Sequence, residues 1–391
     1  MPSADRDERY LLATTIPFIL AHVACLGAIW TGVSWTDLLL FAALYGARMF
    51  GVTGGYHRYF SHRTYRTSRV FAFLLGFLAQ SSAQRGVLWW AGTHRHHHRH
   101  SDGPQDVHSP VRRSFLYSHL GWIFSERYDL TDLTLVPDLA KYPELRWLDR
   151  HPYLPALLTG FAVWLLAGWS GLVVGFMWST VACWHATFAI NSLAHVHGSQ
   201  RYVTGDRSRN NWWLALLTFG EGWHNNHHHV QGSVRQGFRW YEVDISYYVL
   251  RALAALGIVW DLRLPSARAI SADQKLTPAV VERAAGLLAS SFHVERIAAD
   301  LRERLQHDLS HLMEGWHRQV DERLEALRHE LDDLLHAVHV PAMPSMAELR
   351  HRAATMFAHT PSLNDIVERT RQMLLERVTA ELMRRPAPLP A

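Results

Sequence analysis

Cysteine is scarce in this chain, and its scarcity limits the kinds of metal site that the protein can hold. The 391 residues contain only Cys25 and Cys183, and both lie within apolar stretches. Iron–sulfur clusters and cysteine-type zinc sites need more thiolates than these two residues provide. Two cysteines also cannot form the framework of a disulfide-rich fold. Any bound metal is therefore expected to have nitrogen or oxygen ligands.

Clusters of basic residues with interleaved aromatic residues, which are typical of nucleic-acid-binding surfaces, are also lacking. The formal net charge is +4. The first ten residues, MPSADRDERY, are polar, and the apolar stretch that follows them is too long for the core of a signal peptide. We therefore expect no nucleic acid as a partner and no cleaved secretion signal.

Long apolar stretches are present, and they are confined to the first 260 residues. A helix needs roughly 20 apolar residues to cross a bilayer core about 30 Å thick. Three stretches are long enough, and the third can cross twice because it is interrupted between Gly168 and Gly171. Residues 70–90 are apolar as well but contain five polar residues, so we predict a helix that lies at the membrane interface. The four predicted spans cover residues 11–33, 35–55, 153–169 and 171–190.

The distribution of Lys and Arg predicts how these spans are oriented. The connections between the first and second spans and between the third and fourth contain neither residue, whereas the segments after the second and fourth spans are rich in Arg. By the positive-inside rule, both termini and the long middle loop face the cytoplasm. In a bacterium, the membrane would be the inner membrane of the cell.

Histidine is abundant, with 27 residues in the chain. Nine of them form four groups, each close to a predicted membrane boundary. In HRHHH (94–98) and HNNHH (224–228), three histidines stand at positions i, i+3 and i+4 and share one face of a helix. The other groups are HRYFSH (57–62), after the second span, and NSLAH (191–195), at the end of the fourth. The nine candidate ligands are His57, His62, His94, His97, His98, His195, His224, His227 and His228.

Such a set of histidines predicts a metal centre. Imidazole nitrogen suits iron, zinc and copper, and a set of this size can hold two ions. The lack of thiolates favours redox-active iron in an enzyme that uses O2. Because the spans deliver these ligands at one depth, we expect the centre at the cytoplasmic interface with access to the bilayer interior. A substrate with a polar head and an apolar tail suits that position.

Other histidines fall outside this pattern. Single histidines near span ends, such as His22, His151 and His185, are expected to be interfacial side chains. A histidine-rich metal transporter, the alternative from another class, would need histidines along a path through several spans, and His22 and His185 form no such path. Four more adjoin the groups but miss the repeated spacing, and we expect them to face solvent or to support the ligands: His96, His100, His197 and His229.

The histidine groups and their neighbours resemble the motifs of a known family, the membrane-bound acyl desaturases of the stearoyl-CoA desaturase type. The resemblance covers residues 40–262 and includes, in order, GVTGGYHRYFSHRTYRTS, HRHHH, YSHLGWIF, NSLAH and GEGWHNNHH. It implies an all-α integral membrane protein whose four transmembrane helices are capped by a cytosolic helical domain and enclose a bent acyl tunnel. It also implies that the nine histidines ligate two iron ions and that Asn191 holds a metal-bound water.

The reaction implied by the resemblance removes two hydrogens from a saturated CH2–CH2 pair while O2 is reduced to two waters. A delta-9 double bond is expected from the family. The sequence contains no flavin or haem motif, so two electrons must come from an external donor: a ferredoxin, a cytochrome b5-like protein or a reductase. A hydroxylase or acetylenase, which would use the same kind of oxidant, remains an alternative.

Departures from the family pattern bear on the acyl carrier. Gly92 and Glu126 occupy positions where many acyl-CoA members have basic residues, whereas Arg127 retains one such residue. Acyl-CoA is the first expectation, and an acyl group on acyl carrier protein or on a membrane lipid remains an alternative.

Three aromatic residues are candidates for the wall of the acyl tunnel. Phe188 stands near Asn191, where the family commonly has Trp, and the resemblance implies that it lines the tunnel. Phe41 and Tyr45 lie a few turns before His57 on the second span, where tunnels of the family tend to end. We predict that this pair limits the length of the acyl chain.

The last part of the chain, residues 264–391, differs in composition from the membrane part, residues 1–263. Residues 292–335 carry an apolar stripe at helical spacing among many charges. Pro341 and Pro344 interrupt this pattern before a second helical stretch. We predict a charged helical extension without chemistry. A dimerising coiled coil, a docking site for the electron donor and a membrane-surface helix remain alternatives.

Overall fold

The computed structural model describes residues 9–272 together with Ser345 and Ala347. The chain divides into a first unit, Met1–Gln274, and a second, Lys275–Ala391. The predicted extension at residues 264–391 therefore lies almost entirely outside the described residues. Most described residues are helical, as predicted. The strands in this part are β1 (Arg66–Thr67) and β2 (Val259–Trp260), which pair antiparallel.

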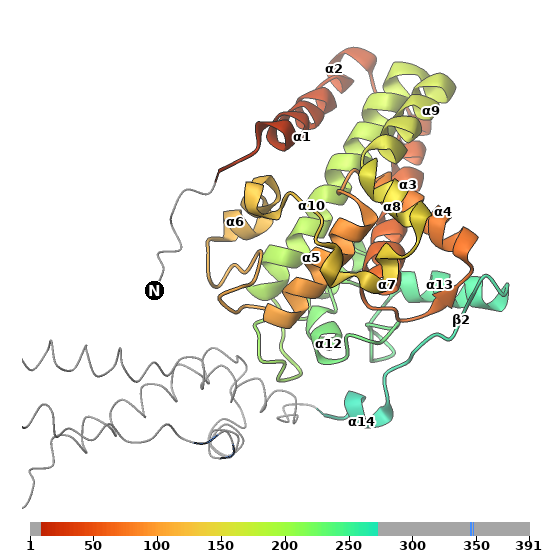
Figure 1. The fold of residues 1–391 in the computed structure, drawn as a ribbon. Coiled ribbons are helices and arrows are strands. Elements are labelled where there is room, and N and C mark those ends of the chain that lie inside the picture. Colours follow the sequence, from red (N-terminus) through yellow and green to blue (C-terminus); the bar gives the residue numbers. More distant parts are fainter. Residues whose placement is uncertain (1–8, 273–344, 346, 348–391) are drawn as a thin grey trace, which may run out of the picture. The chain divides into compact units, whose positions relative to one another are not determined.

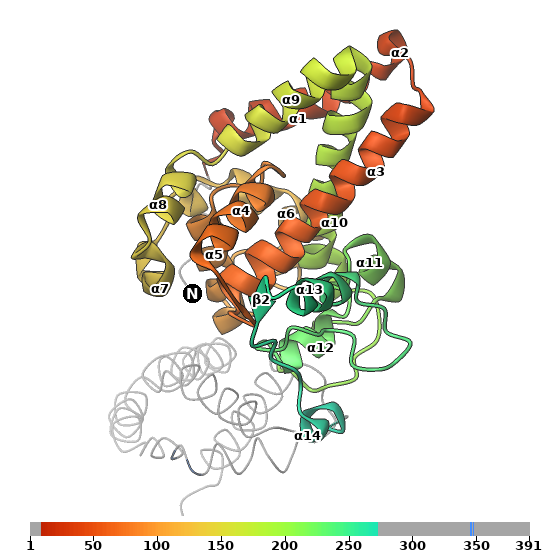
Figure 2. The same ribbon diagram turned by 90° about the vertical axis from the view of Figure 1, so that its right-hand side faces the viewer.

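Three helical segments are long and apolar enough to cross a membrane, with 20, 27 and 42 residues. The first consists of α1 (Leu12–Cys25) and α2 (Ala28–Thr31), and the second of α3 (Trp35–Phe50) and the π-helix η1 (Gly51–Ser61). The third joins α9 (Leu154–Ser170), the π-helix η5 (Gly171–Trp178), α10 (Ser179–Ser192) and η6 (Leu193–His195). Figures 1 and 2 show α3, α9 and α10 side by side, whereas α1 diverges from them in Figure 1.

The third segment folds back on itself at Gly168. This residue has a φ of +63°, which a glycine adopts without steric cost and which interrupts the helix. Beyond the break, Phe176 packs with Ala156 and Val163 of α9 in one buried cluster. The break lies where the apolar pattern placed it, and α9 and the later helices form two packed arms (Figure 1).

The second segment begins at a capping box and ends at the candidate ligands. Ser34 accepts a hydrogen bond from the backbone of Asp37, whose carboxylate accepts one from the backbone of Ser34. Near the middle, buried Arg48 donates hydrogen bonds to Thr180 and to Ser179, which ties α3 to α10. The segment then continues as η1.

A single helix over residues 70–90 was the expectation, and it is wrong. The structure has α4 (Arg69–Gln80) and α5 (Val87–His100), separated by a tight turn. Ala83 and Arg85, rather than Gly86, adopt positive φ values in this turn, +57° and +70°. The carboxylate of Asp149 accepts hydrogen bonds from the backbone N–H groups of Leu88 and Trp89 and so caps α5.

Shorter helices gather at one end of the long segments (Figure 2). A buried apolar core that includes Tyr56, Leu88, Leu148 and Leu250 joins them to the second segment. The remaining helices are α6 (Phe115–His119), η2 (Gly121–Phe124), η3 (Glu126–Tyr128), η4 (Leu133–Leu135), α7 (Pro137–Ala140), α8 (Pro143–Arg150), α11 (Trp212–Leu217), α12 (His224–His229), α13 (Ile245–Ala255) and α14 (Ala267–Ile270).

Close packing of η1 against α4 yields a test of the fold. A Cβ atom at Gly51 would lie 2.9 Å from the backbone nitrogen of Ala79, whereas one at Gly46 would meet only the Phe219 ring, at 3.6 Å. We expect Gly51→Ala to lower the free energy of unfolding by roughly 1–3 kcal/mol through overpacking. Gly46→Ala, the matched control, should be neutral or stabilising by up to about 1 kcal/mol. Thermal unfolding in detergent measures both, and equal effects would contradict the packing.

Candidate metal centre

All nine predicted ligands meet in the structure. The helix η1 contributes His57 and is followed directly by His62, η6 contributes His195, and helices α5 and α12 contribute three histidines each. Their ring nitrogens form two groups, and within each group the atoms lie within 4.8 Å of one another. The five-histidine group comprises His57, His62, His94, His98 and His227. The four-histidine group comprises His97, His195, His224 and His228.

Each three-histidine motif is divided between the two groups. On α5, His94 and His98 join the five-histidine group, while His97 joins the other. On α12 the assignment is reversed: His224 and His228 join the four-histidine group, and His227 joins the five-histidine group. In a helix, residues i+3 and i+4 lie on opposite sides of residue i, so one motif can serve two adjacent positions. The two helices thus hold the groups next to each other.

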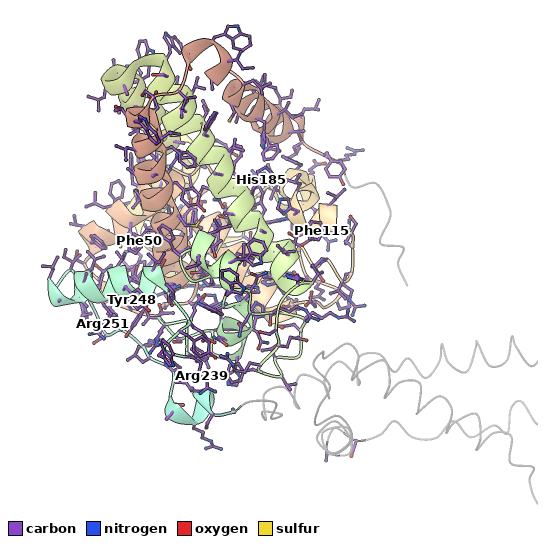
Figure 3. The ribbon with its side chains drawn as sticks, turned by 180° about the vertical axis from the view of Figure 1, so that it is seen from behind. Phe50, Phe115, His185, Arg239, Tyr248 and Arg251 are labelled. Carbon is purple, nitrogen blue, oxygen red and sulfur yellow. The ribbon has the colours of Figure 1, made fainter. Side chains whose placement is uncertain are left out.

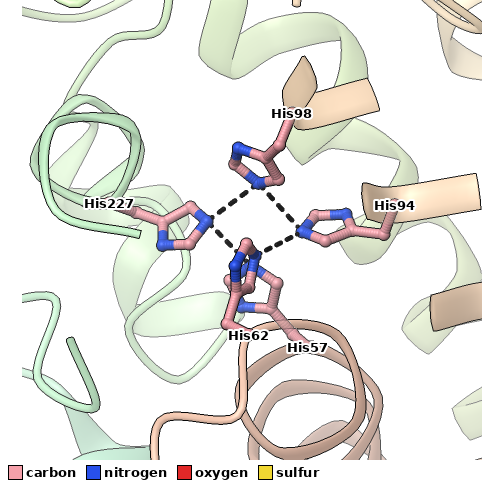
Figure 4. Close-up of side chains that lie close together, drawn as sticks. All are labelled: His57, His62, His94, His98 and His227. Carbon is pink, nitrogen blue, oxygen red and sulfur yellow. Dashed lines mark hydrogen bonds between the residues drawn. The ribbon is translucent and has the colours of Figure 1, made fainter. Parts of the chain in front are cut away.

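The rings of the five-histidine group point toward one another (Figure 4). Their Nε2 atoms are 2.9 Å apart between His62 and His94, and 3.0 Å apart between His98 and His227. Burial, followed by the neighbouring imidazoles, holds the pKa of His94, His98 and His227 well below the ordinary value. These rings are therefore neutral at pH 7, which is the protonation state that a metal ion requires of imidazole ligands.

Carboxylates orient the four-histidine group. Three of its rings bind a carboxylate oxygen through Nδ1, which leaves Nε2 directed at the group: His97 to Asp106 at 2.8 Å, His195 to Asp102 at 2.9 Å and His228 to Asp206 at 2.6 Å. Ligand histidines in metal sites are commonly oriented in this way. The buried Nε2 of His228 has no hydrogen-bond partner.

The charge of these carboxylates is maintained by their partners. Burial opposes ionisation of the Asp206 carboxyl, but His228 and the Ser208 hydroxyl outweigh it and hold the pKa well below its usual range. Burial likewise opposes ionisation of Glu221, yet His57 and Arg58 lower its pKa. Glu221 lies 2.6 Å from Nδ1 of His57 and also accepts from Gln236 at 2.8 Å.

The donor set fits two transition-metal ions. Nine imidazoles converge without a thiolate, most of the rings are uncharged, and an unpartnered Nε2 faces the four-histidine group. Iron is among the ions that such ligands suit.

A large apolar cavity of about 910 Å³ leads to the metal centre. Its walls come from α1, α9 and α10, and its inner end reaches Trp90, His94 and Asn191. A second cavity of about 40 Å³ shares these three residues and extends to Met49 and Val52 on the second segment. The two cavities therefore adjoin each other beside the five-histidine group.

The predicted tunnel residues differ in their positions. Phe188 lines the large cavity. Phe41 and Tyr45, in the described part of the chain, line neither cavity; their rings stack, and the Tyr45 hydroxyl donates to the carbonyl of Leu217 at 2.7 Å. The Arg127 guanidinium lies over the ring of Tyr128, 5.5 Å from its centroid.

Sequence reasoning missed the four carboxylates that bind ligand rings, Asp102, Asp106, Asp206 and Glu221. A signal was present, because two of them follow HRHHH within eight residues and Glu221 stands inside GEGW. Carboxylates close to a histidine motif are candidates for orienting its rings.

Two histidines expected to be isolated interfacial side chains are instead connected. Nε2 of His22 lies 3.0 Å from Nε2 of His185, and Nδ1 of His185 lies 3.0 Å from Nε2 of His119. His119 in turn contacts the hydroxyl of Ser192, next to Asn191. His185, labelled in Figure 3, thus links α1 to α6.

Comparison with known proteins agrees with this geometry. The family model described as Fatty acid desaturase matches residues 33–263, more than half of the chain. The chain belongs to the fatty acid desaturase family. The predicted family is therefore confirmed, and the protein is an oxidoreductase of lipid metabolism.

Relatives of this desaturase act on different acyl carriers, as their names state. Acyl-CoA 5-desaturase AL21 of Anemone leveillei is 37% identical over 63% of this chain and 77% of its own length. Delta-9 acyl-lipid desaturase 1 of Arabidopsis thaliana is 36% identical over 63% and 82%. The hex-5-enoyl-[acyl-carrier protein] acetylenase of Moorena producens (strain JHB) is 32% identical over 69% and 90%.

The neutral rings give the metal-free desaturase a pH-dependent stability. Since the pKa of His94, His98 and His227 is lowered by folding, the unfolded chain takes up protons first as the pH falls below about 6.5. Their contribution is fully present above that pH and is lost toward acid. We expect the melting temperature of metal-free protein to be lower at about pH 5.5 than at about pH 7.5. An unchanged or higher value at pH 5.5 would show that the rings are not buried in neutral form.

Proposed function

We propose that this protein uses O2 to insert a cis double bond, at the delta-9 position, into a saturated long-chain acyl group, with acyl-CoA as the preferred carrier. The observation that carries the proposal is the apolar cavity of about 910 Å³ whose inner end is formed by Asn191 and by His94 of the five-histidine group. An acyl chain in this cavity would pass directly beside the metal centre.

The two histidine groups would each hold one iron ion, and the Asn191 amide would hold a water at the site. When bound, the irons would supply the oxidising power needed to remove hydrogen from an alkyl chain, which offers no polarity for an acid or base. The protein contributes positioning, because the cavity walls hold one CH2–CH2 pair beside His94 and exclude water.

Electrons must enter from outside. Reduction of O2 to two waters takes four electrons, of which the CH2–CH2 pair supplies two. The other two, with two protons, come from a donor, for which we propose a ferredoxin, a cytochrome b5-like protein or a reductase.

We also propose that residues 1–263 form a membrane domain with four spans, and that the metal centre and both termini face the cytoplasm. The 42-residue segment supports two crossings, since at 1.5 Å per residue it is about twice as long as the bilayer core is thick. Its break at Gly168 and the packing of its two arms agree with a hairpin.

The limit on chain length is proposed to lie at Phe41 and Tyr45. These residues and Met49 follow each other at four-residue spacing on α3, so they share one helix face. Met49 lines the small cavity beyond the centre. A chain that passes the centre into this cavity would meet Tyr45 one turn farther on.

Tyr45→Ala therefore tests the chain-length limit. We expect it to shift the preference toward acyl chains longer by about two to four carbons, since it opens about one helical turn of space. Leu39→Ala is the matched control, because Leu39 on the same helix is 71% exposed. Fatty acid profiles of cells fed C16 to C20 substrates measure the shift. An unchanged fatty acid profile for Tyr45→Ala would contradict the proposal that Phe41 and Tyr45 limit the length of the acyl chain.

The reaction is tested by expression in a host that lacks its own desaturase, with gas chromatography–mass spectrometry of the fatty acids. We expect a new monounsaturated acid with the wild type and a loss of at least about 100-fold with His97→Ala, which removes a ligand together with the imidazole partner of Asp106. His96→Ala is the control, since His96 is the adjacent residue but binds the Gln105 carbonyl outside both groups.

The identity of the product decides between the chemistries. Derivatised fragments of the product give the double-bond position. A hydroxy acid would assign the protein to the hydroxylases, and a triple bond to the acetylenases. No new product from iron-loaded protein supplied with a competent donor would contradict the proposal. Purified enzyme given stearoyl groups on CoA, on acyl carrier protein or on a phospholipid identifies the carrier.

A further inference from the structure

The two histidine groups differ in the charge that surrounds them. In the four-histidine group, three of the four rings bind a carboxylate through Nδ1. In the five-histidine group, only His57 does so among the described residues, with Glu221 as its partner. The buried Nδ1 atoms of His98 and His227 have no hydrogen-bond partner.

The one carboxylate that binds a ring of the five-histidine group is partly compensated by an arginine. Arg58, whose side chain is fully buried, binds Glu221 at 3.1 Å and Asp244 at 2.9 Å. The guanidinium therefore offsets only part of the negative charge of Glu221, because it also faces Asp244. An ion in the five-histidine group would therefore experience a reduced share of this charge.

The carboxylates at the four-histidine group keep their charge. Besides His97, Asp106 accepts from the backbone N–H groups of Asp102 and His108, and besides His228, Asp206 accepts from the hydroxyls of Thr204 and Ser208. In the part of the chain that the structure describes, neither Asp106 nor Asp206 pairs with an arginine or lysine.

The two groups also differ in burial, and the four-histidine group is the more deeply buried. All four members of the four-histidine group are buried, whereas His62 and His94 of the five-histidine group are half-buried. His94 lines both cavities, whereas His224 of the four-histidine group lines only the small one, so the five-histidine group is the more open to the acyl path. A chelator can reach that group more easily.

We infer that the two ions are held unequally: the ion in the four-histidine group binds more tightly and leaves last. The five-histidine group offers one more imidazole, but an additional neutral ligand adds no negative charge to the site. Two carboxylates without an arginine or lysine partner and the deeper burial outweigh it, because carboxylates that bind ligand imidazoles commonly change metal affinity by about 10- to 100-fold. The inference rests on the proposed dinuclear iron function, and it makes Asp106 and Asp206 positioning residues for one ion only.

The test is the time course of iron release. Iron-loaded protein is reduced without oxygen and mixed with ferrozine, and total iron is determined by mass spectrometry. We expect two phases of equal amplitude in the wild type. Asp206→Asn should accelerate the slow phase by about 10- to 100-fold and leave the fast phase unchanged. Because the asparagine oxygen can still accept from His228, the change reports the lost charge.

Two further variants keep the inference falsifiable if Asp206→Asn fails to fold. Asp106→Asn should act on the slow phase in the same way through His97. Asp138→Asn is the control. Asp138 binds Arg95, which lies on α5 as His97 does but is not a ligand. This variant should change neither phase.

The outcomes distinguish a failure of this inference from a failure of the proposed dinuclear iron function. One phase that releases two ions in the wild type, or acceleration of the fast phase by Asp206→Asn, overturns the unequal binding. Equal acceleration of both phases does so as well, since it shows a general loss of stability. Fewer than two bound irons in fully loaded wild type overturns the dinuclear centre itself, independently of any assay for desaturation.

Discussion

The hydrogen bond between a buried carboxylate and the Nδ1 of an imidazole recurs at four of the nine candidate ligands. Nine rings can share a small buried volume only while most are neutral and their nitrogens are held in fixed directions. The carboxylates fix the tautomer by accepting the Nδ1 proton, so Nε2 is left to face the centre. Two of these bonds, His57 to Glu221 and His195 to Asp102, also tie distant parts of the chain together. Asp102, for example, follows α5 but orients His195 at the end of the third long segment.

The need to hold the imidazole nitrogens in fixed directions also explains how the helices around the site pack against one another. The η1 helix carries Gly51 against the backbone of α4, and this close approach brings His57 toward the rings of α5. Polar contacts within the long segments, such as those of Arg48 to α10, keep the segments in register. The cavity between these helices therefore ends at a polar centre, and in the proposed function its walls rather than charge would position the acyl chain.

Sequence patterns predicted the components that depend on local spacing. The i, i+3, i+4 motifs placed three histidines on one helix face, and the long apolar runs together with Gly168 gave the helices and their break. The sequence pattern could not predict that His94 and His97 belong to different groups, because that assignment depends on how α5 and α12 face each other. The turn between α4 and α5 was missed because Ala83 and Arg85, rather than glycines, adopt positive φ. The roles of Asp102 and Asp206 depend on long-range contacts, which a pattern in one sequence does not record.

The most direct measurement is an anomalous difference map at the iron edge from crystals of the iron-loaded protein. Two peaks are predicted, one enclosed by the Nε2 atoms of His57, His62, His94, His98 and His227, and one by those of His97, His195, His224 and His228. A single peak, or peaks that lie away from these nitrogens, would contradict a dinuclear centre built from the nine histidines.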